Sequence, residues 1–482
     1  MSRKRIKCSW SAKIRNLRSF FGLLAYIYGL SELSGMPDES IAQSEAGAKI
    51  EAQCRMMMSS MNVPAASLAV VKGANIYQVS ALGLANVERG IRASTHMRFP
   101  IGSISKQFTA AAVLLLAEQG KLSIDDAVSK FLPEIANSKK ITIRELLAQT
   151  SGYQDYWPQN YVPVEMRSNV DPYDIAKRWT NRALTFAPGT AWQYSSTNFL
   201  LAGLIVEKVS GQPLFLFLRH NIFEPLKMQS VIDLENKDEV KDIPQGYLSY
   251  ALGPLRNAPT QGMGWLFGSG GLVMTAEDLA KWDISIIRRT ILSEKSYYEM
   301  ESVARLSNGL ASSYGLGIYV AMQSGVRVLE HDGSVSGFSA FNMVVPDLGV
   351  GVVVLANQTT SELPEELARY IAAQLIPKQV ERAARLEANR RLLESLQRGD
   401  VDRAVLSENA NEHFNSQAIA DFSDSLLPLG YPTEMLEIES GARGGLDYFL
   451  YRVRFASRNL DFLVQEKSNG KIEDIQLVPT AH

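Results

Sequence analysis

The order of strand-like and helix-like segments constrains the fold of this chain more than any other feature of its sequence. Two strand-like segments lie near the start and four follow much later, at 65–72, 75–87, 317–322, 326–330, 338–345 and 349–356. The stretch between them, up to about residue 305, is largely helical in pattern and carries several helix-capping sequences, and one more helix is expected at 364–375. The pattern predicts an α+β domain with one antiparallel sheet assembled from distant segments and a large helical insertion.

The sequence changes in character after Pro377. Residues 379–398 form a highly charged helical stretch that Gly399 stops, and four strand-like runs follow, at 434–439, 448–455, 459–466 and 471–478. In the second run, apolar and other residues alternate as on a half-buried strand. We therefore predict a main domain over 43–377 and a small appended α+β domain over 378–482. No set of residues in the appended domain converges on chemistry, so we expect it to serve packing or partner binding.

The amino terminus has the pattern of a targeting segment. Residues 1–18 contain seven basic residues and no acidic one, and residues 19–30 are mostly apolar. A basic region followed by a short apolar region is typical of a secretory signal, and Ser40-Ile41-Ala42 offers small residues for cleavage. The alternative is an uncleaved interfacial anchor, because twelve residues are too few for a bilayer span of about 20. We predict that residues 1–42 are a signal peptide or an anchor. The protein is then exported to the periplasm or the outside, and any membrane association runs through this segment alone.

The overall composition excludes several classes of function. The net charge of −2 and the absence of a basic stripe give no sign of a nucleic-acid partner. Cys8 and Cys54 are the only cysteines, and the five histidines are scattered along the chain, so neither a disulfide framework nor a metal site is expected. We therefore expect no cofactor.

A hydroxyl and an amine stand three residues apart in Ser103-Ile-Ser-Lys106. Gly102 precedes them and a long apolar run follows up to Gly120, which is the pattern of a buried helix. On one helix face, Lys106 can reach Ser103 and help to remove its proton, as an activated nucleophile requires. The alternative is a helix-capping serine with a solvated lysine. A second pair with the same spacing, Ser468 and Lys471, encloses Asn-Gly, which marks a turn.

Two later segments could complete a catalytic site. Tyr194 stands just before the apolar helix 200–209. It can act as a base only if a nearby positive charge, such as that of Lys106, favours the phenolate; otherwise it is a filler residue. Residues 331–338 join two strand-like segments and are rich in small residues. Small residues let a substrate carbonyl approach backbone N–H groups, as an oxyanion hole requires. The alternative for His331 is a strand-end histidine with satisfied hydrogen bonds.

The order S-x-x-K, then Y-x-N, then K-T-G or H-x-G resembles that of serine hydrolases of the class C β-lactamase and D-alanyl-D-alanine carboxypeptidase type. The resemblance covers about residues 50–375 and includes two framework segments, 146–152 and 268–279. It implies a β-lactamase/transpeptidase-like domain. It also implies roles for individual residues: Ser103 as nucleophile with Lys106 as its partner, Tyr194 as general base, the backbone N–H groups of Ser103 and Ser334 as oxyanion hole, and His331, Gly333 and Ser196 on the substrate-binding side.

Two departures from the family pattern bear on the substrate. Ser196 stands where Y-x-N has an asparagine that binds the amide of the substrate, and His331-Asp-Gly333 replaces K-T-G, which removes a fixed positive charge. We predict a serine hydrolase that cleaves a small-molecule ester, amide or peptide, as an esterase or a D-amino-acid peptidase does. The alternatives are a β-lactamase proper and a catalytically silent binding or regulatory protein on the same fold. An α/β-hydrolase is disfavoured because the chain contains no G-x-S-x-G.

Overall fold

The computed structural model describes residues 39–479 apart from residues 160, 235–241, 324–325 and 360. Most of the predicted leader therefore lies outside the described residues, and its role stays a prediction. Helix α1 (Glu39–Met61) begins at the end of that segment, so the predicted cleavage point at Ala42 falls in its first turn. The domain boundaries at 42/43 and 377/378 also stay predictions.

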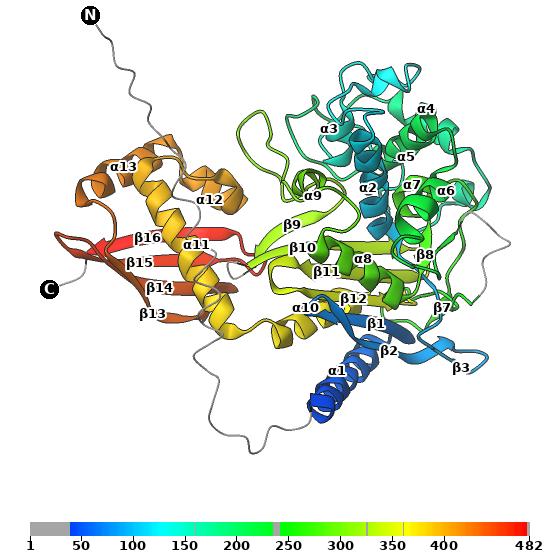
Figure 1. The fold of residues 1–482 in the computed structure, drawn as a ribbon, viewed down its shortest axis with the longest axis horizontal. Helices are drawn as coiled ribbons and strands as arrows, with labels where there is room; N and C mark the ends of the chain where they lie inside the picture. Colours follow the sequence, from blue (N-terminus) through cyan, green and yellow to red (C-terminus); the bar gives the residue numbers. More distant parts are fainter. Residues whose placement is uncertain (1–38, 160, 235–241, 324–325, 360, 480–482) are drawn as a thin grey trace, which may run out of the picture. The chain divides into compact units, whose positions relative to one another are not determined.

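A seven-stranded sheet forms the centre of the hydrolase region (Figure 1). Each pair of neighbouring strands in it is antiparallel, and the sequence-distant β1 and β12 lie side by side at its middle. The strands in spatial order are β3 (Ile91–Arg92), β2 (Asn75–Asn86), β1 (Ala65–Lys72), β12 (Val350–Ala356), β11 (Phe338–Val345), β10 (Val326–Val335) and β9 (Tyr319–Gln323). The predicted antiparallel sheet from both ends of the domain is confirmed.

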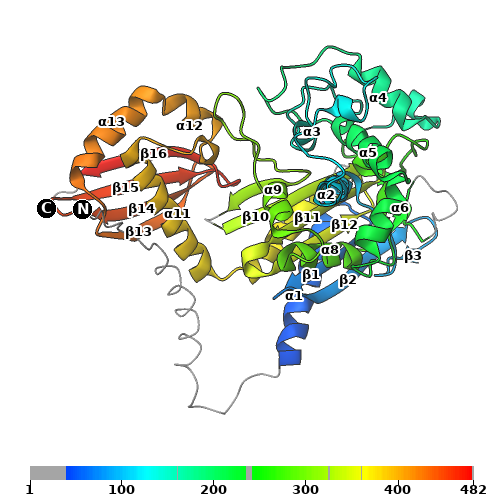
Figure 2. The ribbon, with the colours of Figure 1, turned by 45° about the horizontal axis from the view of Figure 1, so that its top comes forward.

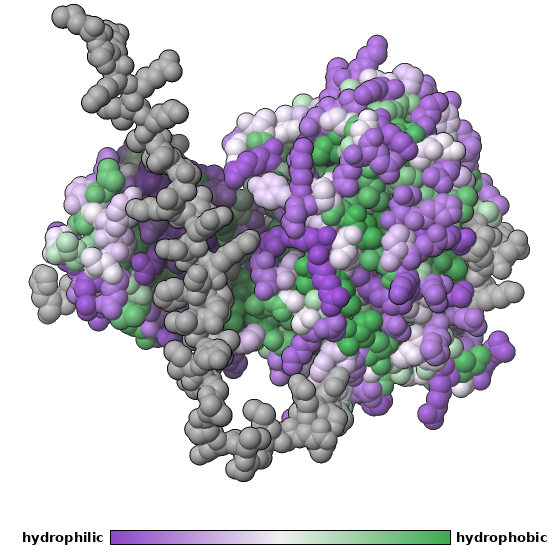
Figure 3. Space-filling model, viewed as in Figure 1, coloured by the Kyte–Doolittle hydropathy of each residue, from purple (hydrophilic) through white to green (hydrophobic). Residues whose placement is uncertain are grey.

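The central strands are buried on both faces because each face packs against helices. On β1, Leu68 and Val70 belong to an apolar cluster that contains residues of α1 and of α10 (Leu363–Leu375). Ala69 and Val71, which point the other way, belong to a second cluster with residues of α2 (Ser105–Glu118) and α8 (Ala276–Arg288). Figure 2 shows α8 and α2 on one side of the sheet and α1 on the other. The face drawn in Figure 3 is mostly hydrophilic, with hydrophobic patches interspersed.

The insertion between β2 and β9 contains several helices, as predicted, but more than half of its residues lie in loops, turns and short strands. Besides α2 and α8 it contains α3 (Ile143–Leu147), α4 (Pro172–Thr180), α5 (Ser196–Ser210), α6 (Leu214–Leu218), α7 (Phe267–Gly270), α9 (Glu294–Met300) and the short strands β4 (Phe99–Pro100), β5 (Ile232–Asp233), β6 (Tyr247–Leu248), β7 (Arg256–Asn257) and β8 (Leu272–Met274). A capping box at Thr142 starts α3, and Thr275 caps α8. The similar pattern at Ser123 starts no α-helix, because Asp126 accepts the Ser123 N–H within a turn.

The C-terminal region has a sheet and an apolar cluster of its own. Helix α11 (Lys378–Arg398) leads into α12 (Glu408–His413), α13 (Ser416–Leu426) and a four-stranded antiparallel sheet of β13 (Glu434–Arg443), β14 (Leu446–Arg454), β15 (Asn459–Glu466) and β16 (Ile472–Pro479). The four predicted strands are present, whereas α12 and α13 were not predicted. Tyr451, Val453 and Phe462 are fully buried in the cluster. The small C-terminal α+β domain in the predicted fold class is therefore confirmed.

Within the part of the chain that the structure describes, no single helix is both long and apolar enough to cross a membrane. Helix α5 and the segment Leu214–Phe223 satisfy the length and hydropathy requirements only when taken together, and their axes are bent by 74°.

Candidate active site

Two glycines bring the turn before α2 against strand β10. Gly102 has a φ of +51°, and a Cβ there would lie 2.7 Å from the Ser334 backbone nitrogen. A Cβ on Gly333 would lie 2.0 Å from the carbonyl oxygen of Ile101. Both distances are too short for a side chain, so glycine at these positions is required for the close approach. The approach places Ser103, in the 3₁₀ turn Gly102–Ile104, next to Ser334 on β10.

Lys106 is a buried amine with two hydrogen-bond acceptors. Its Nζ donates to Ser103 Oγ at 2.9 Å and to the Ser269 carbonyl oxygen at 2.8 Å, and the residue is 1% exposed. Burial lowers the pKa of Lys106 from its usual 10.5 to about 7, although the charges of Asp155 and Asp332 act in the opposite direction. The amine is therefore partly neutral at neutral pH and able to accept a proton.

Tyr194 lies beside the Lys106 amine, as we expected from the sequence. Its pKa, however, is not lowered as a nearby positive charge would lower it. Lys106 Nζ lies 4.9 Å from the centre of the Tyr194 ring. Burial nevertheless raises the pKa of Tyr194 well above its usual 10, and the charge of Tyr314 adds to this effect. A hydrogen bond with Ser103 acts in the other direction. Because burial is the largest contribution, the phenol stays protonated at neutral pH, and Lys106 is the better proton acceptor.

His331 does not lie where the resemblance had placed it. The residue is fully buried, and it is not among the residues that line the cavity around Ser103. Its Nδ1 lies 2.6 Å from the Asp332 carbonyl oxygen, which can only accept, so Nδ1 carries the proton and Nε2 accepts from the Tyr314 hydroxyl at 2.9 Å. Burial lowers the pKa of His331 to about 4. The expectation of a substrate contact is therefore corrected: His331 is a neutral packing residue behind Tyr194, at a ring distance of 6.2 Å.

The expectation for residues 331–338 is corrected in a second respect. Residues 331–335 belong to β10 rather than to a connection between strands, and a short turn at Ser336 and Gly337 leads into β11. Side chains alternate along a strand, so Asp332 and Ser334 face the cavity while His331 is buried on the other side. Gly333 has no side chain that could contact a substrate. Its role is to let β10 lie close to the backbone of Ile101.

A carboxylate that the sequence analysis missed lies in the same wall. Asp155 Oδ1 accepts the backbone N–H of Trp157 at 3.1 Å and that of Ser196 at 3.0 Å. Ser196 is the first residue of α5, so Asp155 ties the segment after framework residues 146–152 to the helix that follows Tyr194. From the framework itself, the Gln149 side chain accepts the Ser195 N–H at 3.0 Å. These bonds position Tyr194 and Ser196.

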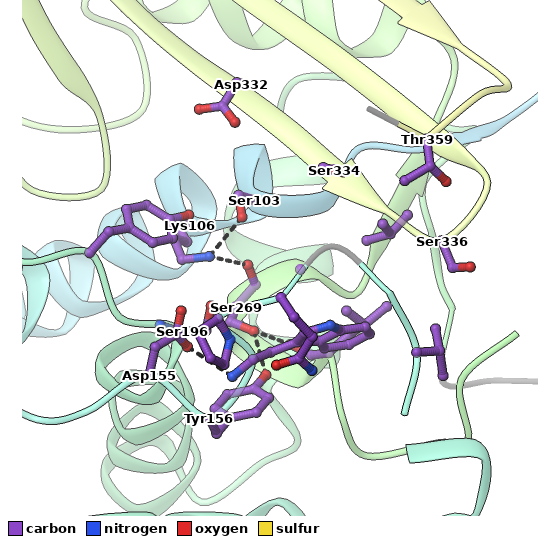
Figure 4. Close-up of a pocket in the computed structure, with 18 of the residues that line it drawn as sticks. Ser103, Lys106, Asp155, Tyr156, Ser196, Ser269, Asp332, Ser334, Ser336 and Thr359 are labelled. Carbon is purple, nitrogen blue, oxygen red and sulfur yellow. Dashed lines mark hydrogen bonds between the residues drawn. The ribbon is translucent and has the colours of Figure 1, made fainter. Parts of the chain in front are cut away.

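The predicted residues Ser103, Lys106, Tyr194, Ser196 and Ser334 line one cavity of about 270 Å³ (Figure 4). The wall also contains residues that were not predicted: Asp155, Tyr156, Trp157, Pro158, Gln159, Tyr161, Val162, Leu266, Ser269, Gly270, Tyr319, Asp332, Val335, Ser336 and Thr359. Ser269 could have been found, because it lies in a framework segment and its carbonyl binds Lys106. Asp155 gave no signal of its own in the sequence.

The second S-x-x-K pair has no such surroundings. Ser468 and Lys471 lie in the turn between β15 and β16, where Ser468 is exposed and Lys471 Nζ donates to the Ala404 carbonyl. The spacing alone thus does not produce a reactive pair.

The fold and the cavity agree with what is known of one family. A sequence model of the family described as Beta-lactamase matches residues 50–376, which is more than half of the chain. The chain therefore belongs to the Beta-lactamase family of serine hydrolases, whose fold is shared by penicillin-binding-protein homologues and D-amino acid amidases.

Individual proteins extend this likeness. Protein flp of Staphylococcus aureus (strain MRSA252) is 27% identical over 326 residues, which cover 65% of this chain but only 63% of that protein. The octameric penicillin-binding protein homologue from Pyrococcus abyssi has a TM-score of 0.61 at 22% identity and covers 90% of this chain and 98% of its own, so the likeness in fold extends beyond residues 50–376. The D-stereospecific amidohydrolase from Streptomyces sp. has a TM-score of 0.55 at 25% identity and covers 69% of this chain and 98% of its own.

Proposed function

We propose that this chain cleaves an amide or ester bond through a covalent acyl-enzyme on Ser103. The observation that carries the proposal is the buried Lys106 amine, which lies 2.9 Å from Ser103 Oγ and has a pKa lowered to about 7. A partly neutral amine beside a hydroxyl is the arrangement that activates a serine nucleophile. Membership of the family, and the likeness to an amidohydrolase, support an amide or ester as the bond that is broken.

In the first step, Ser103 Oγ adds to the carbonyl carbon of the substrate while the hydroxyl proton moves to Lys106 Nζ. The carbonyl oxygen becomes an anion and accepts hydrogen bonds from the backbone N–H groups of Ser103 and Ser334, which is the usual large contribution to such reactions. Tyr194 then gives its proton to the departing nitrogen or oxygen as the bond to carbon breaks, and takes the extra proton of Lys106 in return. The products are an acyl ester on Ser103 and a free amine or alcohol.

In the second step, a water molecule attacks the acyl ester and gives one proton to Lys106. The tetrahedral intermediate collapses, Ser103 recovers its proton, and the carboxylic acid leaves. This assignment gives Lys106 the role of base and Tyr194 the role of relay, because burial keeps the phenol protonated. It differs from the family-based expectation, in which Tyr194 was the base.

The charge of the cavity favours a non-β-lactam substrate. Among the described residues that line it, Lys106 is the only lysine or arginine, and its amine already donates to Ser103 and Ser269. A β-lactam carries a carboxylate, which would meet Asp155 and Asp332 rather than a free cation. The same carboxylates would not repel a neutral or cationic ester or amide.

The test compares Ser103→Ala with Ser468→Ala, which removes the serine of the same motif in its exposed setting. A fluorophosphonate probe followed by peptide mapping should label Ser103 in the wild type and in Ser468→Ala, and p-nitrophenyl acyl esters should be hydrolysed by both. Ser103→Ala should lose labelling and at least about 10³-fold in kcat/KM. Labelling of a different serine would refute the nucleophile, and the absence of any adduct would favour the silent binding protein. Cephalosporin turnover that matches the esters would favour a β-lactamase.

A further inference from the structure

A groove of about 1020 Å³ lies between the loop that precedes β9 and the C-terminal region, and no step of the proposed reaction uses it. One wall contains residues of the segment 306–313, and the other contains residues of α12 and of the turn between β15 and β16. Both walls belong to the same compact unit of the chain. Gly470 fits that turn against β9, because a Cβ there would overlap the Met322 carbonyl oxygen, and Arg305 and Asp402 form an ion pair between the two walls.

Most of the polar groups in this groove are neutral. Eight of the nineteen described residues that line it carry an amide or an aliphatic hydroxyl group. Two buried polar atoms of lining residues have no hydrogen-bond partner among the described residues: the donor Trp192 Nε1 in one wall and the acceptor Asn411 Oδ1 in the other. A buried polar atom without a partner costs about 1–3 kcal/mol. The groove therefore favours a ligand that can both accept and donate hydrogen bonds, as hydroxyl groups do.

The charged side chains in the groove do not favour an anionic ligand. Its three cations already bind groups of the protein, because Arg403 and Lys471 donate to backbone carbonyl oxygens and Lys467 pairs with a carboxylate. The two acidic residues, Glu408 and Glu412, are exposed and lie four residues apart on α12, which places both on one helix face. A carboxylate accepts a hydrogen bond from a hydroxyl group more strongly than a neutral oxygen does.

Two aromatic rings add apolar surface to this polar groove. Trp192 and Tyr319 both line it, and their ring centres lie 6.2 Å apart. An aromatic ring can pack against the C–H groups of a sugar ring, while neighbouring polar groups bind its hydroxyls. Tyr319 also lines the Ser103 cavity, so a ligand that packs on this ring lies next to the proposed active site.

We propose that this groove binds a neutral carbohydrate chain, with sugar rings on Trp192 and Tyr319 and hydroxyl groups bonded to Asn411 and the two α12 carboxylates. A neutral sugar supplies donors and acceptors for both walls and needs no free cation. An apolar ligand would instead remove the amides and hydroxyls from water without replacing their hydrogen bonds. The site goes beyond the proposed function, because sugar binding requires no chemistry at Ser103.

The test measures the binding of three neutral trisaccharides, triacetylchitotriose, maltotriose and cellotriose, to the Ser103→Ala protein by ligand-observed NMR titration. We expect at least one of them to bind with a Kd of about 1 mM or below. Trp192→Phe removes the indole N–H and part of the ring, and it should weaken that binding about 10-fold. The double variant Glu408→Gln with Glu412→Gln keeps the shape of α12 and should weaken it at least about fivefold. Glu387→Gln, on an exposed residue of α11 that does not line the groove, is the matched control and should leave the Kd unchanged.

Three outcomes would overturn the proposal. One is the absence of binding for all three sugars at about 10 mM. Another is a Kd that the α12 double variant leaves unchanged, because the sugar would then lie elsewhere; this variant decides the question even if Trp192→Phe does not fold. The last is trilysine that binds more tightly than every sugar and loses its affinity in the α12 variant, which would indicate a site for a cationic peptide.

The outcome is independent of the proposed reaction. Fluorophosphonate labelling of Ser103 in a wild type that binds none of the sugars would refute the carbohydrate site alone. Sugar binding by a wild type that shows no labelling would refute the acyl-enzyme alone.

Discussion

Replacing Lys106 by methionine should stabilise the protein while abolishing its activity. Burial lowers the pKa of this amine from 10.5 to about 7, and each pKa unit is worth about 1.4 kcal/mol, so holding the charged form here costs on the order of 5 kcal/mol. Methionine has a similar length and no charge, but it leaves the Ser269 carbonyl oxygen without its donor, at a cost of about 1–2 kcal/mol. The net expectation at pH 6 is a free energy of unfolding about 3–4 kcal/mol higher than that of the wild type.

The advantage of Lys106→Met should depend on pH with a defined sign. The pKa of Lys106 in the folded state lies below that in the unfolded state, so the unfolded wild type binds more protons between pH 7 and 10.5. Wild-type stability therefore rises relative to the variant by about 1.4 kcal/mol per pH unit in this window. The advantage of methionine is complete below pH 7, falls to zero between about pH 9 and 10, and is reversed by pH 10.5, where the unpaired Ser269 carbonyl still costs about 1–2 kcal/mol.

The assay is chemical unfolding of both proteins at pH 6, 8 and 9.5, followed by tryptophan fluorescence, together with hydrolysis of a p-nitrophenyl ester. Lys121→Met changes an exposed lysine just beyond the same helix and should show neither the gain nor the pH dependence. A Lys106→Met variant that is less stable than the wild type at pH 6, or a difference that does not change with pH, would refute the argument that burial destabilises the charged amine. Full ester hydrolysis by the variant would refute its role as base.

Two further predictions concern a glycine beside the Ser103 turn and a buried carboxylate. Gly333→Ala should lower kcat/KM at least about 10²-fold. The reason is that a Cβ 2.0 Å from the Ile101 oxygen forces β10 away from the Ser103 turn and misplaces an oxyanion donor. As a control, Gly90→Ala should leave kcat/KM unchanged, because a Cβ at Gly90 meets no neighbouring atom. Asp283 is fully buried and its pKa is raised well above its usual range by burial, so the folded state keeps a proton that the unfolded state loses. Asp283→Asn, measured by chemical unfolding, should match the wild type near pH 4 and exceed it in stability at pH 8; a variant that is less stable at pH 8 would contradict this.

The arrangement of the main sheet could be predicted because its strands carry a clear local signal. Strands β11 and β12 are mostly apolar in sequence and buried along their whole length, which agrees with burial on both faces. The helices between β2 and β9 separate the two groups of strands in the sequence, so antiparallel pairing of distant segments was the simplest arrangement. The capping pattern at Ser123 failed because the same residues that start a helix also close a turn. Helices α12 and α13 were not predicted because neither contains an extended apolar run.

The contact between Ser103 and Lys106 could be predicted, whereas the wall around it could not. Ser103 and Lys106 are three residues apart, so a helical turn at this point brings their side chains into contact. Asp155 reaches the cavity only because its carboxylate binds the N–H of Ser196, which is 41 residues away in the sequence. The sequence pattern led us to expect His331 on the substrate-binding side, and it could not show that the ring is buried against Tyr314 instead.

The contrast between the two S-x-x-K pairs indicates where the proposed reactivity and selectivity would come from in this chain. Lys471 has the same spacing to a serine as Lys106, but Ser468 is exposed, and the Lys471 amine is bound to the Ala404 carbonyl. Burial lowers the pKa of both amines, but Lys106 donates to its serine hydroxyl in the wall of a cavity, and in the proposed reaction this contact makes a common spacing reactive. The reactive group itself carries no preference for a substrate, because any accessible carbonyl can meet it. Substrate selection must therefore come from the cavity wall. There, Asp155 and Asp332 supply negative charge, and Trp157 and Tyr161 supply apolar surface. His331 is neutral and is buried outside the cavity lining. Exchanging the charge of that wall should therefore change which substrates are cleaved without changing how they are cleaved.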